Sequence, residues 1–292
     1  MKVACICNDD YANFMYCQVE AMRMAGVDAT GYKMQQSVYN YPVQCSISRG
    51  SMMRNITADV YMVFHSHMEV LNYINTNRSP VVVVHTGTRF RKNADQITKE
   101  CVGYRNVIAL PEFATHLPDA DYVVGCIDDR SIRQVPPVQN RFGHYPSNAE
   151  VKGTEVIRRV SIKAGVPIHI DTTRMNYLNH VKRVSSVDIV VEMLKPKQDG
   201  GYAYGSFGMQ ALEASAIGKV VITNNLTGQE LYARTYGDCE LEIANDEQQL
   251  YDKLIQWRNG DTINKGRAVA AWYHAKHGMA ATGKRWAGIV RG

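Results

Sequence analysis

The chain has 292 residues, 45% of them hydrophobic, and a formal net charge of +5. This length and apolar content allow one large core or two cores of about 140 residues each, and two modest domains fit best. No apolar run approaches the roughly 18 residues of a transmembrane helix. Asp9 and Asp10 follow the first apolar run too soon for a signal peptide, so we expect a cytoplasmic protein without a membrane segment.

The seven cysteines are an odd number and include no CxxC pair. This spacing is typical of reduced thiols and argues against a disulfide framework or a zinc site. Asp119 and Asp121 spell a DxD metal motif, but they precede an expected strand instead of following one. We interpret them as part of a turn.

Apolar runs of strand length open the chain and recur through its first half. The run KVACIC is followed by the loop NDDYANF and by a helix ending at Gly26, which together form the opening unit of an α/β domain. Consecutive prolines, Pro136 and Pro137, cannot continue a helix or a central strand, so they mark a linker between domains at 1–135 and 136–262. Further strands of the first domain are expected at residues 58–67, 80–87, 107–110 and 121–126.

The second domain repeats the alternation of strands and helices. Apolar runs at 187–194 and 219–223 predict buried parallel strands. Between them, Ser206 is a candidate N-cap for a helix over 207–217, and Gly218 supplies its left-handed end. Upstream, a strand at 167–171 and a helix at 175–184 are expected.

The loop before the helix at 207–217 is suited to binding an anion. Gly205 and Gly208 let the backbone approach a ligand, and the positive end of the helix dipole favours phosphate. Glu213 lies on a helix otherwise lined by small residues, and its carboxylate could accept hydrogen bonds from a ribose. The alternative is an ordinary strand-to-helix turn, which two glycines alone do not exclude.

The segment around Glu213 resembles the donor-site signature of family 4 retaining glycosyltransferases of the GT-B fold. Glu213 matches the second glutamate of that signature, which holds the nucleotide ribose, and Gly205 stands in place of the first. A branch of the family with a Y-G-x-x-x-x-x-E variant is more similar. The segment HYPSNAEVKGT also resembles that branch, and the resemblance assigns its Lys152 to the donor diphosphate.

Two segments of the first domain resemble the same family. HTGTRFR is similar to the H-x-H-G-[ST]-D-x-R segment, in which His85, Gly87 and Arg91 match, whereas Thr86 replaces the second histidine. Asn13 lies in the first loop, which faces the donor in family 4 enzymes. A lone histidine at a strand end is more often structural than catalytic, and only its place in this loop favours catalysis.

The resemblance implies the GT-B fold, in which two Rossmann-like α/β domains have parallel sheets facing a central cleft. It implies a metal-independent retaining glycosyltransferase that moves a sugar from a nucleotide-sugar co-substrate to a hydroxyl acceptor, without a cofactor. The expected catalytic residues are His85, Lys152 and Glu213. The expected donor-binding residues are Asn13, Gly87, Arg91, Lys152, Gly153, Gly205, Ser206, Phe207, Gly208 and Glu213.

The tail at 263–292 contains no Asp or Glu and carries the positive excess of the chain. Its basic residues are Lys265, Arg267, Lys276, Lys284, Arg285 and Arg291. Trp272, Tyr273 and Trp286 are interleaved with them, a combination that suits nucleic acid or an anionic surface. The alternative is a helical tail that packs back towards the first domain, with its aromatic residues in the cores and its charges in solvent.

The sequence leaves the acceptor, the sugar, the nucleotide base and the oligomeric state open. A basic, aromatic tail without a membrane segment favours a hydroxymethylated base in DNA as acceptor. The alternatives are an envelope glycan or glycolipid acceptor, and a non-catalytic nucleotide-sugar-binding protein, which Gly205 and Thr86 keep open. A nicotinamide oxidoreductase is disfavoured because no G-x-G-x-x-G follows the first strand.

Overall fold

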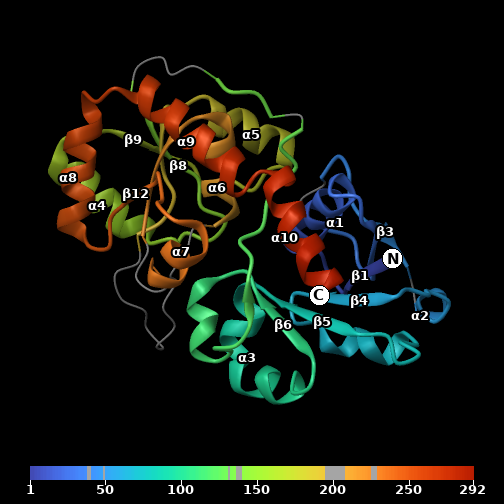
Figure 1. The fold of residues 1–292 in the computed structure, drawn as a ribbon. Coiled ribbons are helices and arrows are strands. Elements are labelled where there is room, and N and C mark those ends of the chain that lie inside the picture. Colours follow the sequence, from blue (N-terminus) through green and yellow to red (C-terminus); the bar gives the residue numbers. More distant parts are fainter. Residues whose placement is uncertain (38–40, 49, 131, 136–139, 195–207, 225–228) are drawn as a thin grey trace. The chain divides into compact units, whose positions relative to one another are not determined.

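The chain divides into two compact units in the computed structural model (Figure 1). Unit 1 comprises Met1–Asp128 and His277–Gly292, and unit 2 comprises Asp129–Lys276. The sequence predicts a boundary at 135/136 and a single tail at 263–292, whereas the tail is divided between the two units at residue 276. The structure describes residues 1–37, 41–48, 50–130, 132–135, 140–194, 208–224 and 229–292, without the side chains of residues 50 and 51.

Unit 1 is built on a seven-stranded parallel sheet in the order β3-β2-β1-β4-β5-β6-β7. Its strands are β1 (Lys2–Cys7), β2 (Asp28–Lys33), β3 (Ser46–Ile47), β4 (Val60–Phe64), β5 (Val81–His85), β6 (Arg105–Ile108) and β7 (Asp121–Tyr122). Its α-helices are α1 (Phe14–Met24), α2 (Gly50–Met53), α3 (Gly87–Glu100) and α10 (Met279–Arg291). Short 3-10 helices are η1 (Tyr11–Asn13), η2 (Met68–Tyr73) and η3 (Pro111–Thr115).

The central strands of unit 1 are buried on both faces, as their continuous apolar runs require. On one face, Ile6 and Val63 pack in a core with Met53. Alternate residues point to the other face, where the ring of Phe64 lies 6.0 Å from that of Trp286 in α10. The carboxyl-terminal helix therefore completes the core of unit 1 beside α1 (Figure 1).

Unit 2 is built on a five-stranded parallel sheet in the order β12-β11-β10-β8-β9. Its strands are β8 (Phe142–His144), β9 (Ile168–Ile170), β10 (Ile189–Val191), β11 (Val220–Thr223) and β12 (Glu242–Ile243). Its helices are α4 (Thr154–Ala164), α5 (Tyr177–Ser185), α6 (Met209–Ile217), α7 (Gln229–Tyr236), α8 (Glu247–Arg258) and α9 (Thr262–Lys276).

Two helical layers pack on the sheet of unit 2. Side chains of α4 and α8 share one core with Ile189 and Val191 of β10. Helix α9 packs on α6 and β11, and its Gly266 is needed there because a Cβ atom would lie 2.2 Å from the carbonyl oxygen of Gly218. Gly218 ends α6 with a φ of 86°, as its place in the sequence predicted.

The aromatic residues of the tail belong to the cores of the units. Tyr273 and Trp286 are fully buried, and Trp272 is 6% exposed. The indole N–H of Trp286 donates to Gln18 at 3.1 Å, and that of Trp272 donates to the carbonyl oxygen of Asp238 at 3.1 Å. These rings are therefore unavailable for stacking on nucleic-acid bases, and the aromatic part of the DNA argument is wrong.

The two parallel α/β units confirm the predicted fold class. Each sheet has a doubly wound strand order of the kind found in nucleotide-binding folds. Across the described ranges, no helix has both the length and the apolarity needed to cross a bilayer.

Candidate functional site

Each sheet contains a point where the strand order reverses, and open α/β sheets bind ligands at the carboxyl ends of the strands there. In unit 1 the reversal lies between β1 and β4, and in unit 2 it lies between β8 and β10. A ligand site is therefore expected at the loops that follow these four strands.

At the edge of unit 2, a lysine and a carboxylate meet. Lys152, in the loop between β8 and α4, forms an ion pair with Glu192, the first residue after β10. The other oxygen of Glu192 accepts a hydrogen bond from the hydroxyl of Thr223, at the end of β11, over 2.9 Å. The Glu192 side chain is fully buried, whereas that of Lys152 is 16% exposed, so the lysine is the more accessible partner of the pair.

Helix α6 begins directly against this pair. Gly208 is its N-cap residue, and a Cβ atom there would lie 2.6 Å from Glu192 Oε1 and 2.7 Å from Lys152 Nζ. Only a residue without a side chain lets the positive end of α6 come so close to the ammonium. The helix dipole and Lys152 therefore act together in favour of an anion at this point.

His144 holds the three elements around the pair together. Its Nδ1 donates to the carbonyl oxygen of Val191 at 2.7 Å, and the hydroxyl of Thr154 donates to its Nε2 at 2.9 Å. Gly153, which precedes Thr154, starts α4 in the left-handed conformation with a φ of 69°. Burial lowers the pKa of His144 to about 4, so its ring is neutral at pH 7.

Acid is expected to destabilise unit 2 through His144. The unfolded chain protonates this histidine near pH 6.5, while the folded pKa is about 4, so stability present above pH 6.5 is lost as the pH falls towards 4. At pH 5 this one residue should lower the free energy of unfolding by about 2 kcal/mol. Urea unfolding at pH 7 and pH 5 measures the loss. His144→Gln, which keeps a donor and an acceptor, should lose about 2 kcal/mol less than the wild type, and equal losses would contradict the assignment.

Glu213 is held by a partner that the sequence did not reveal. It lies on α6 beyond Gly208, is 7% exposed, and its Oε2 lies 3.1 Å from Nε2 of His180 on α5. Arg183 donates to the other ring nitrogen of His180 at 3.2 Å and pairs with Asp171 at 2.8 Å. Glu213, the residue predicted to bind the ribose, is therefore already oriented by a polar network.

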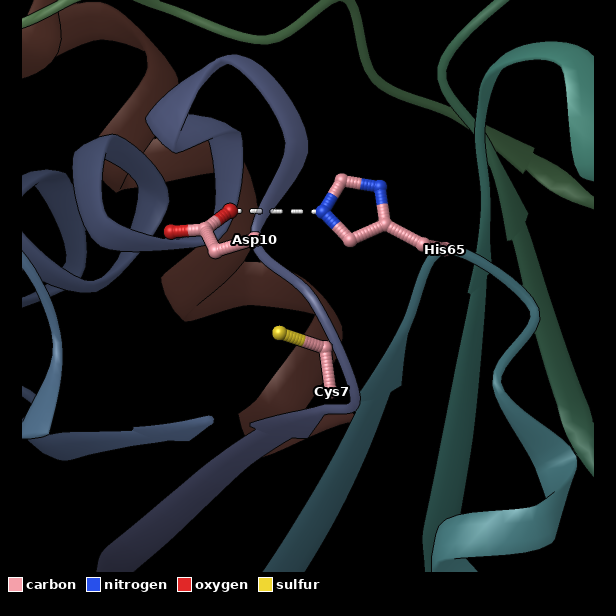
Figure 2. A group of neighbouring side chains, drawn as sticks. All are labelled: Cys7, Asp10 and His65. Atoms are coloured by element: carbon pink, nitrogen blue, oxygen red, sulfur yellow. Dashed lines mark hydrogen bonds and ion pairs between the residues drawn. The ribbon is translucent and has the colours of Figure 1, made fainter. Parts of the chain in front are cut away.

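The edge of unit 1 carries a second polar cluster, drawn in Figure 2, of Cys7, Asp10 and His65. Asp10 caps α1, since its two oxygens accept the backbone N–H groups of Met15 at 2.7 Å and Tyr16 at 3.0 Å. Nε2 of His65 lies 3.3 Å from Asp10 Oδ1. His65 has a φ of 60°, an uncommon conformation for a non-glycine residue and one that tends to occur at functional sites.

The chemistry of this cluster fits a hydrogen-bonded dyad better than a metal centre. Among the described His, Cys, Asp and Glu residues, these three have ligand atoms within 4.8 Å of one another. Asp10 is engaged by two backbone N–H groups, and the second ring nitrogen of His65 contacts the hydroxyl of Thr86 at 2.5 Å. Burial raises the pKa of the Cys7 thiol well above its usual value, which disfavours the thiolate that a metal requires.

His85 lies inside unit 1. Its side chain is fully buried, with Nδ1 3.0 Å from the hydroxyl of Ser66 and Nε2 2.9 Å from the side-chain oxygen of Asn106. Burial lowers its pKa to about 4, so the ring is neutral.

The histidine that contacts the half-buried Thr86 is His65, which sequence reasoning missed because it treated His65–Ser66–His67 as the end of a strand. The polar HSH run directly after an apolar strand was the available signal.

The other predicted residues of unit 1 make contacts that support the fold. Gly87 begins α3 with a φ of 61°. Arg91 forms an ion pair with Glu112 and lies over the ring of Phe113. Asn13 donates to the carbonyl oxygen of Val43 at 2.9 Å, while its own side-chain oxygen is buried and finds no partner among the described residues.

In unit 2 the structure brings Lys152, Gly153 and Gly208 together, with Glu213 further along the same helix as Gly208. Gly205, Ser206 and Phe207 lie outside the described residues, and the helix that was expected to begin at 207 begins at Met209. The structure adds three residues to the site that the sequence did not indicate: Thr223, Glu192 and His180.

No protein-family model and no curated protein matches this sequence. Solved structures match it over its whole length. The glycosyltransferase AviGT4, involved in avilamycin A biosynthesis, is 10% identical with a TM-score of 0.68, and the match covers 100% of this chain and 97% of that one. HepE from Anabaena, solved with UDP and glucose, is 10% identical with a TM-score of 0.69, covering 100% and 99%. Sucrose-phosphate synthase from Thermosynechococcus elongatus is 11% identical with a TM-score of 0.62, covering 100% and 98%.

These neighbours are GT-B glycosyltransferases, so the chain has the GT-B glycosyltransferase fold, as the sequence predicted.

Proposed function

We propose that this protein is a retaining glycosyltransferase that takes its sugar from a nucleotide-sugar donor bound to unit 2. The observation that carries the proposal is the ammonium of Lys152 against the start of α6, at the strand-order reversal of the sheet. HepE has been solved with UDP and with UDP-glucose, which supports a uridine nucleotide sugar as the first donor to test.

In this reaction the bond between the anomeric carbon and the diphosphate breaks while the acceptor hydroxyl oxygen bonds to that carbon. Negative charge develops on the departing phosphate, which takes up the proton of the hydroxyl. The proximity of Lys152 to the N-terminal end of α6 supports a role for both in stabilising that charge, which is the main contribution a protein makes to such a step. Glu213 accepts hydrogen bonds from the ribose. We propose that no metal takes part, because the ammonium of Lys152 and the first N–H groups of α6 offer hydrogen-bond donors to the phosphate oxygens here.

For the acceptor we propose a hydroxymethylated base in DNA. The support comes from the cations of the tail, among which Arg267, Lys284 and Arg291 are exposed. With the tail aromatic residues buried, the tail can contact a phosphate backbone but cannot stack on bases. An envelope glycan or glycolipid is the alternative acceptor, and a non-catalytic nucleotide-sugar-binding protein is the alternative to an enzyme.

Radiolabelled UDP-, GDP- and CDP-sugars, incubated with hydroxymethylated DNA and separately with glycan and glycolipid acceptors, test the proposal. Label transferred to the modified DNA, and not to unmodified DNA, is expected. Label transferred to a glycan or glycolipid instead would show that the acceptor is not DNA. Donor binding with neither transfer nor slow release of free sugar would leave only a binding protein. Addition of EDTA should not change the rate, and NMR of the product should show the anomeric configuration of the donor.

Replacement of Glu213 by alanine is expected to weaken UDP binding by about 1.5 to 3 kcal/mol, because the ribose loses a charged hydrogen-bond acceptor. Calorimetry with UDP measures the loss. The wild type should also discriminate against 2′,3′-dideoxy-UDP, whereas the variant should bind both nucleotides about equally. Equal discrimination by the two proteins would remove Glu213 from the ribose site.

A further inference from the structure

The ammonium that faces the proposed diphosphate position is already bound to an internal anion. Glu192 is fully buried after β10 and pairs with Lys152 through one oxygen. Its other oxygen is fixed by Thr223, and the backbone N–H of Leu194 donates to the carbonyl oxygen of Lys152 at 3.2 Å. Both the carboxylate and the lysine loop are therefore held in place.

A second buried lysine–carboxylate pair lies at the opposite end of the same strand and serves as a comparison. Asp188 precedes β10, and its carboxylate lies 4.0 Å from Nζ of Lys219, with side-chain exposures of 1% and 0%. Lys152 is more exposed than Lys219, and only the Lys152 pair lies against a glycine at a helix start. The two pairs have the same chemistry, but the pair at the carboxyl edge is the one open to a ligand.

We propose that Glu192 is an internal competitor of the donor diphosphate: it holds Lys152 while the site is empty and sets a low affinity for nucleoside diphosphates, so that the product leaves. This rests on the proposed function of unit 2. The pair has no net charge, whereas Lys152 alone would present a full positive charge to the diphosphate at low dielectric. An ammonium has three N–H donors, so Lys152 can keep one bond to Glu192 and direct the others at phosphate oxygens.

The test compares the affinity for UDP with that for uridine, which has no phosphate, by calorimetry. Glu192→Gln keeps the size of the side chain and an acceptor for Lys152 but removes the charge. Its affinity for UDP is expected to rise about tenfold, while its affinity for uridine stays that of the wild type. If Glu192→Gln does not fold, Glu192→Asp, which draws the charge back by one methylene, should tighten UDP binding in the same direction by a smaller factor.

Asp188→Asn is the matched control, since it removes the same charge from the other end of β10. It should lower the melting temperature without changing the affinity for UDP. Unchanged or weaker UDP binding by a folded Glu192→Gln variant would overturn the inference and leave the proposed function standing. A wild-type protein that binds no nucleoside diphosphate of any base would overturn both.

Discussion

Exchange of Lys152 for methionine is expected to lower the rate of sugar transfer by about 100-fold or more, because the departing diphosphate loses its nearest fixed positive charge. The structure adds a second consequence. With its partner removed, the buried carboxylate of Glu192 remains uncompensated, which costs about 3 to 5 kcal/mol of stability. A slow rate of transfer in the single variant could therefore come either from lost catalysis or from lost folding.

The double variant Lys152→Met/Glu192→Gln separates the two effects. It leaves no unpaired charge, so its melting temperature should return most of the way to that of the wild type, while transfer stays about 100-fold slow. Rates with saturating donor and thermal unfolding are measured on the same preparations. A double variant that transfers sugar at the wild-type rate would show that Lys152 only supports the fold.

Replacement of Gly208 by alanine is expected to weaken UDP binding about tenfold or more while leaving the protein folded. The added methyl group would lie 2.6 Å from Glu192 Oε1 and 2.7 Å from Lys152 Nζ, so both side chains must shift. Both atoms are ends of side chains, and the φ of Gly208 is −76°, which alanine adopts readily, so the backbone can keep its conformation. The change displaces the ammonium from the N-terminal end of α6, where the diphosphate is expected to bind. A tenfold weaker affinity for UDP corresponds to a loss of about 1.4 kcal/mol of binding free energy.

Gly288→Ala is the control for this change. A Cβ atom at that position on α10 meets nothing within 4 Å, so alanine there should preserve or raise stability by about 0.5 to 1 kcal/mol and leave UDP binding unchanged. Calorimetry with UDP on both variants makes the comparison. Wild-type affinity in Gly208→Ala would mean that the diphosphate does not approach Lys152 at the start of α6.

Local sequence signals were sufficient for most of the architecture. Continuous apolar runs such as VVVV give parallel strands buried on both faces, and β5 and β11 lie within the ranges expected. Gly218 ends α6 in the left-handed conformation because a residue without Cβ adopts it at little cost. These features depend on residues that are near one another in the chain, and a single sequence therefore reveals them.

The partners within the site were decided by the tertiary structure. Glu192 reads in the sequence as the polar end of an apolar strand, and it becomes a site residue only because the parallel register brings it to Lys152, 40 residues away. His65 follows β4, His85 ends β5, and both are buried. Their partners depend on neighbouring segments. His85 contacts Ser66 and Asn106 of β6, whereas His65, with a left-handed backbone, contacts Asp10.

The tail at 263–292 also has some properties that its sequence determines and others that only the packing decides. Its sequence by itself determined two properties, a net positive charge and the ability to form helices with aromatic residues along them. Only the packing decided that Trp286 fills the core of unit 1 and Trp272 that of unit 2, leaving the cations outside. The physical reason is that charge is a property of composition, whereas burial depends on which surface the folded chain offers to a large ring, and that surface is assembled from strands and helices far away in the sequence.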